Sequence, residues 1–94
     1  MRVKLLHKFW NLVFVSRMPK DPELPDDREG DCDSPTTPHK QIRILKSLEG
    51  EKRLDRIIHE FTHAAFWHLD EEQVEAFGGD LSRALWRLGY RDRD

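Results

Sequence analysis

Two histidines and a glutamate stand close together in the run His59-Glu60-Phe61-Thr62-His63. On a helix, residues i and i+4 lie on the same face, so both imidazoles can bind one tetrahedral Zn²⁺ ion. Glu60 follows the first histidine and can take a proton from a water molecule at that metal. The spacing therefore predicts a zinc site with His59 and His63 as ligands and Glu60 as general base.

The residues around this motif predict the helix that it needs. Apolar side chains recur with a period of 3.6 residues, which favours a helix from 54 to about 67. The charged run at 49–52 predicts a turn before it. The members of the apolar stripe are Leu54, Ile57, Ile58, Phe61 and Ala65.

A second helix is expected from Glu71 to about Leu88. Asp70 is a natural N-cap with Gln73 three places later, and Gly89 stands where a C-cap glycine belongs. Glycines at 78 and 79 weaken this helix by about 1 kcal/mol each, unless they permit another element to approach closely. The apolar stripe that should face the core is Val74, Phe77, Leu81, Ala84, Leu85 and Leu88.

Two short strands are predicted ahead of these helices. Residues 8–18 and 41–45 alternate and are rich in β-branched or aromatic side chains. Residues 19–39 hold all five prolines and a cluster of acids, which indicates a loop. The expected fold is α+β: a single domain, 1–94, with a two- or three-stranded sheet packed on the two helices.

Composition excludes several classes of protein. The chain has 94 residues, with 16 basic and 18 acidic side chains interspersed, so nucleic-acid binding is not expected. No apolar run approaches the roughly 20 residues of a membrane span, and no signal peptide is predicted. The only cysteine, Cys32, cannot form an internal disulfide, which indicates a reducing, cytoplasmic setting. Because it lies between two aspartates, its pKa should be raised, which argues against a nucleophile.

The third zinc ligand does not follow from the motif alone. The metzincin pattern would need Gly and His where this chain has Phe66 and Leu69, and His68 is about 140° around the helix from His63. The run from Glu71 to Phe77, however, resembles the glutamate helix of gluzincin metallopeptidases. That resemblance implies Glu71 as the third ligand.

The same resemblance gives a role to a second glutamate. It implies that Glu75 supports a zinc-bound histidine without itself binding the metal. Simple hairpin geometry argues differently, because two helices that fold back at about residue 69 bring His63 level with Glu75. Glu75 therefore stays open as the alternative ligand to Glu71.

The order of elements also resembles small phage and bacterial zinc-peptidase-like proteins, distantly similar to SprT-like domains. The likeness includes the turn at 30–33, the strand at 40–44 and the closing residues 85–90. It implies hydrolysis of a peptide or protein substrate, with 41–45 as an edge strand that pairs with the peptide. Two alternatives remain: an inactive, zinc-stabilised binding module, or a helical interaction domain with an accidental HExxH. The sequence carries no prediction of oligomeric state.

Overall fold

Four strands form one mixed sheet in the computed structural model, which describes residues 1–92. Strand β2 is antiparallel to β1 and parallel to β4, and β3 is antiparallel to β4, so the order across the sheet is β1-β2-β4-β3. The bounds are β1 Arg2–Leu5, β2 Lys8–Val15, β3 Gly30–Cys32 and β4 Gln41–Leu45.

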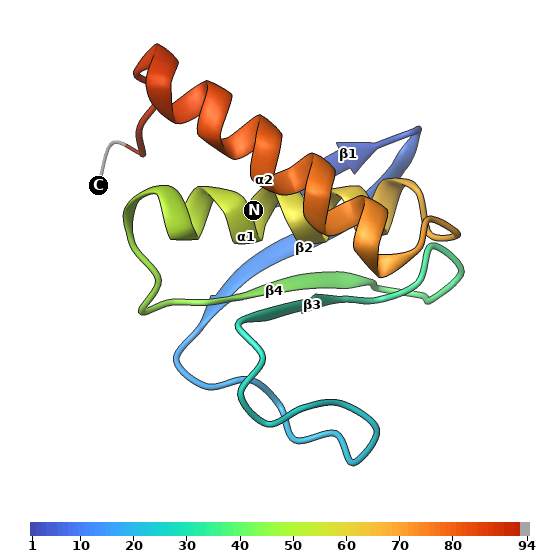
Figure 1. Cartoon of the computed structure of the whole chain (residues 1–94). Helices are drawn as coiled ribbons and strands as arrows, with labels where there is room; N and C mark the ends of the chain where they lie inside the picture. The colour runs from blue at the N-terminus through green and yellow to red at the C-terminus, as the bar shows by residue number, and fades with distance from the viewer. Residues whose placement is uncertain (93–94) are drawn as a thin grey trace.

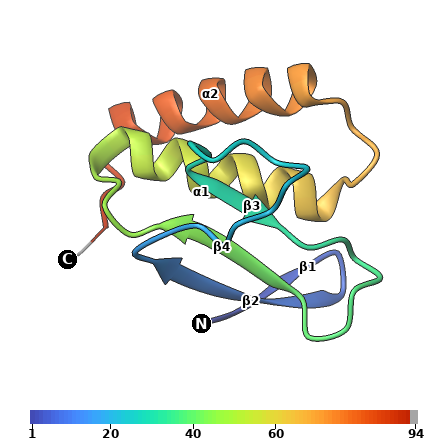
Figure 2. The same ribbon diagram turned by 90° about the horizontal axis from the view of Figure 1, so that it is seen from below.

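Two helices complete the structure as further layers on one side of this sheet. Helix α1, Gly50–Ala65, lies on the sheet, and α2, Glu71–Leu88, lies on the far side of α1 (Figures 1 and 2). Among the described helices and strands, α2 contacts α1 alone. The predicted α+β class is confirmed. Neither of these helices has both the length and the apolar character that crossing a membrane requires.

The sheet is larger than the sequence predicted. Strand β1 was not expected, and β3 lies inside the stretch 19–39 that was predicted to be a loop. A tight turn at Leu6 and His7, both with positive φ, joins β1 to β2. Each missed strand has four residues or fewer, which is too short for alternation to reveal it.

Element ends also differ from the predictions. Strand β2 ends at Val15 rather than 18, and α1 begins at Gly50, so most of the predicted charged turn is its first helical turn. The same helix ends at Ala65, two residues early. The ends of α2 are as predicted, with the Asp70 side chain accepting from the Gln73 N–H at 2.8 Å.

Charged side chains hold the short strand β3 in place. The guanidinium of Arg43 on β4 donates hydrogen bonds to two aspartates of this segment. Its Nε lies 2.5 Å from Asp31 Oδ1, and its Nη2 lies 2.7 Å from Asp33 Oδ1. Arg28 donates to the other oxygen of Asp31 at 3.1 Å. Burial alone would raise the pKa of Asp33, but hydrogen bonds from Arg43 and from the Gln41 N–H outweigh it and lower that pKa. The strand therefore depends on ion pairs rather than on intrinsic strand propensity.

The strand order changes which strand has a free edge. Strand β4 lies between β2 and β3, so both of its edges are paired, and the prediction that 41–45 is an edge strand is wrong. The two edge strands of the sheet are β1 and β3, and β3 also packs against α1. The chain between β2 and β3 loops out below the sheet in Figure 1.

The hydrophobic core lies between the sheet and α1. Its members come from β2, β4, α1 and the β4–α1 connection, and they are Trp10, Leu12, Ile42, Ile44, Leu48 and Ala64. Helix α2 adds little to it. Of the apolar stripe expected to face the core, Phe77 and Leu88 are 52% and 73% exposed, because α2 has only one helix to cover.

The two adjacent glycines of α2 should respond in opposite ways to substitution. A Cβ on Gly79 would meet nothing within 4 Å, whereas a Cβ on Gly78 would already lie 3.5 Å from the His59 Cα. We expect Gly79→Ala to raise the free energy of unfolding by about 0.5–1 kcal/mol, because alanine favours the helix. Gly78→Leu should lower it by about 1–3 kcal/mol, because the larger side chain forces the helices apart. Urea unfolding measures both, and equal effects at the two sites would contradict the close approach.

Candidate metal centre

Two imidazole nitrogens and one carboxylate group converge between the two helices. The Nε2 atoms of His59 and His63 lie 3.1 Å apart, and each faces one oxygen of the Glu71 carboxylate, at 2.9 Å and 2.7 Å respectively. The imidazole rings meet at 66° with centroids 4.8 Å apart. Two imidazoles and a carboxylate thus face one common point.

This donor set fits a tetrahedral zinc ion. Zinc binds imidazole nitrogen at 2.0–2.1 Å and carboxylate oxygen at similar lengths, so two donors on a tetrahedron lie about 3.3 Å apart. The separations between the donor atoms here are slightly shorter, at 2.7 to 3.1 Å. A small outward movement of the Glu71 side chain, which is 65% exposed, would make room for the ion.

The pairing of the helices selects Glu71 over Glu75. Gly78 lies against His59, which puts Glu75 close to the level of His63, as simple hairpin geometry supposes. At 100° per residue, however, Glu71 is only about 20° around α2 from Gly78, whereas Glu75 is about 60° away. The structure therefore brings Glu71 to the histidines, while Glu75 is exposed and outside the cluster.

Glu60 is the most unusual charged residue of the site. Its side chain is only 5% exposed, and its closest charged partner is Arg56, one turn earlier, at 3.3 Å. Burial raises the pKa of Glu60, while Arg56 acts in the opposite direction. A buried carboxyl group with a raised pKa is a typical feature of sites that use general acid–base catalysis.

The surroundings of His59 favour the neutral form of its imidazole. Burial, with a further contribution from the positive charge of Arg56, lowers the pKa of His59. The imidazole is therefore neutral at physiological pH, and a neutral imidazole is the form that binds metals.

A pocket of about 420 Å³ opens over these groups. Its walls include all of β3, part of the proline-rich loop and the side chain of Trp67. Cys32 lies in the wall, and burial, with the nearby carboxylates of Glu60, Asp31 and Asp33, raises its pKa. The predicted direction is confirmed, with burial as the larger cause, and a protonated thiol is a poor metal ligand.

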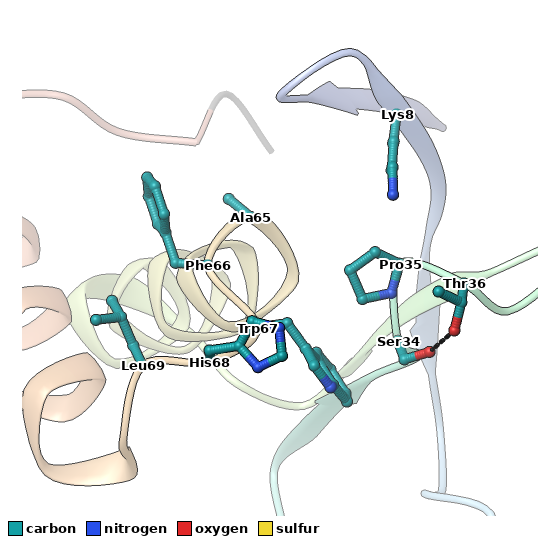
Figure 3. Close-up of a pocket in the computed structure, with 9 residues that line it drawn as sticks. All are labelled: Lys8, Ser34, Pro35, Thr36, Ala65, Phe66, Trp67, His68 and Leu69. Carbon is teal, nitrogen blue, oxygen red and sulfur yellow. Dashed lines mark hydrogen bonds between the residues drawn. The ribbon is translucent and has the colours of Figure 1, made fainter.

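A second, larger pocket of about 740 Å³ lies at the end of α1. We call it the Trp67 pocket; Figure 3 shows Trp67 extending from the end of α1 toward Ser34. His68, which the helix geometry argued against as a zinc ligand, is exposed and lines this pocket rather than the donor cluster. The lining residues are Lys8, Ser34, Pro35, Thr36, Ala65, Phe66, Trp67, His68 and Leu69.

Comparisons with models of protein families, with curated proteins and with solved structures found no match to this chain.

The burial of Glu60 predicts a pH-dependent stability in the metal-free protein. In the folded state the pKa of Glu60 lies above its ordinary value of 4.5, so the unfolded chain loses this proton more readily than the folded protein. The contribution of Glu60 to the free energy of unfolding should therefore fall as the pH rises above 4.5. We expect Glu60→Gln to be more stable than the unsubstituted protein at pH 7, with a difference that disappears below pH 4.5. Thermal melts in chelator across this range measure it. The exposed Glu75→Gln is the control, and a Glu60→Gln difference that does not change with pH would contradict the prediction.

Proposed function

We propose that the protein is a zinc-dependent peptide hydrolase, with His59, His63 and Glu71 as zinc ligands and Glu60 as general base. The observation that carries this proposal is that a buried carboxyl group lies in the same pocket as three converging donors. A purely structural zinc site has no need of Glu60 there, since burying a carboxylate lowers stability. Bound zinc would supply Lewis acidity, polarising the scissile carbonyl and acidifying a water molecule.

Glu60 would move the proton in this reaction. Its carboxylate would accept a proton from the attacking water and then deliver it to the leaving amine. Arg56 would keep the carboxylate available in its charged form, because its guanidinium opposes the effect of burial on the pKa of Glu60. His59 would remain a neutral donor, in agreement with its lowered pKa.

The free edge of β3 is the best candidate for binding the substrate backbone. The three residues of β3 line the pocket that contains Glu60, and β3 is at the edge of the sheet. An extended peptide could add to this edge as a further strand, with main-chain hydrogen bonds that do not depend on its sequence. We therefore assign the pairing with the substrate to β3 rather than to the strand at 41–45, which is internal to the sheet.

The first test is metal content. We expect about one zinc per chain by mass spectrometry, and chelation should lower the melting temperature by about 10 °C, the effect of a ligand held well above its Kd. Substituting both histidines by alanine should abolish the zinc and the effect of the chelator together. A protein without zinc, and with a melt indifferent to chelator, would leave a helical interaction domain with an accidental motif.

A matched pair of variants tests the third ligand within that experiment. Glu71→Gln should weaken zinc binding at least about tenfold, because it removes a charged ligand. Glu75→Gln makes the same chemical change one turn away and should leave the affinity unchanged. The reverse result would assign the site to Glu75.

The second test separates an enzyme from a binding module. We expect the zinc-loaded protein to cleave members of a peptide library, and Glu60→Gln to lower kcat at least about 100-fold while zinc is retained. Zinc at one per chain without cleavage of any peptide would instead support the inactive, zinc-stabilised binding module.

A further inference from the structure

Large apolar side chains that are exposed to solvent line the Trp67 pocket. Phe66, Trp67 and Leu69 are 51%, 43% and 38% exposed, and all three line it. They lie in the connection between the helices, where none of them belongs to the core. A concave site with apolar walls and few polar groups is the usual form of a binding site for an apolar group.

Two structural links join this pocket to the candidate metal centre. The Trp67 side chain lines both pockets, and the chain segment that forms β3 along one continues through 34–36 along the other. Trp67 also follows His63 by only four residues, in the turn just after the end of α1 at Ala65. Side chains on one face of an extended peptide recur every two residues, about 6.6 Å apart, so a peptide along β3 can pass the metal centre and place one of them in the adjoining Trp67 pocket.

We propose that the Trp67 pocket binds an aromatic or large aliphatic side chain of the peptide substrate, two residues from the bond that lies at the metal centre. This assignment rests on the proposed function and adds the substrate class. Antiparallel pairing is the more stable arrangement for an added strand. A peptide antiparallel to β3 runs from the 34–36 end toward the metal centre, so the apolar residue lies on the N-terminal side of the scissile bond.

The polar groups of the pocket add to its selectivity. The hydroxyl groups of Ser34 and Thr36 are 2.9 Å apart and hydrogen-bond to each other, so they do not require a polar partner from the ligand. Lys8 contributes a positive charge to the lining, which disfavours lysine or arginine in the substrate. The pocket therefore selects for size and apolar character.

Binding can be tested without any turnover. The full chain, zinc-free and zinc-loaded, is titrated with acetyl-Gly-Phe-Gly-Gly-amide and with the matched acetyl-Gly-Ser-Gly-Gly-amide, and ¹H–¹⁵N NMR spectra are followed. We expect the Phe peptide to shift the Trp67 indole signal and the amide of Thr36, and to bind at least about tenfold more tightly than the Ser peptide. In a peptide library, cleavage should occur two residues after an aromatic or large aliphatic residue.

Two alanine variants provide the matched control. Trp67→Ala should abolish the preference for the Phe peptide and leave zinc content unchanged, whereas Phe77→Ala should keep it. Phe77 is similarly exposed, at 52%, but lines neither pocket. Equal binding of the two peptides, or a Phe preference that survives Trp67→Ala, would overturn the proposal.

The outcomes also separate this proposal from the proposed function. Zinc-dependent cleavage with no preference at this position would remove the Trp67 pocket assignment and leave the hydrolase. A Phe preference in a protein that takes up no zinc would establish the binding site and remove its role as a substrate pocket. A Trp67 signal that shifts with protein concentration alone would show self-association at this face and would also overturn the proposal.

Discussion

The candidate site depends on the close approach of two helices at one glycine. Gly78 of α2 faces the backbone of α1 at His59, where even a Cβ would already be in van der Waals contact at 3.5 Å, so the helices are closely spaced there. Glu71, almost two turns earlier on the same face of α2, can then reach both histidines. In the part of the chain that the structure describes, helix α2 contacts none of the strands. The third donor is therefore held by the α1–α2 interface alone, and a change in the distance between the helices would change the donor geometry directly.

A second glycine, Gly30, makes room for the arginine that pairs with Glu60. A Cβ on Gly30 of β3 would lie 2.9 Å from Cδ of Arg56, so the absence of a side chain leaves room for the arginine to cross the strand. The guanidinium then reaches Glu60 in the buried wall of the site. Burial favours the protonated form of Glu60 and Arg56 favours the charged form. Burial is the stronger of the two influences, so the pKa of Glu60 lies above its usual value.

The sheet places this chemistry beside a surface for binding. Arg43 pairs with two aspartates of the β3 segment and so fixes a strand of only three residues at the edge next to α1. The chain continues from that edge to the Trp67 pocket, where apolar side chains remain exposed. The polar donors and the apolar surface are adjacent but separate, as in binding sites where a few polar groups fix orientation and apolar walls provide affinity.

The sequence by itself determined the features that depend on near neighbours in the chain. The i, i+4 spacing of His59 and His63, the Asp70 cap and the ends of α2 are local properties, and the structure agrees with them. Only the tertiary structure decided the rest. Strand β3 needs Arg43, which is 12 residues from Asp31, and the choice of Glu71 over Glu75 needs the face that α2 turns to α1. The edge position of β3 and the burial of Glu60 likewise depend on the order of the strands and on packing between distant segments. Periodicity carries no information about such contacts, because it describes one element and not the partner that the element meets.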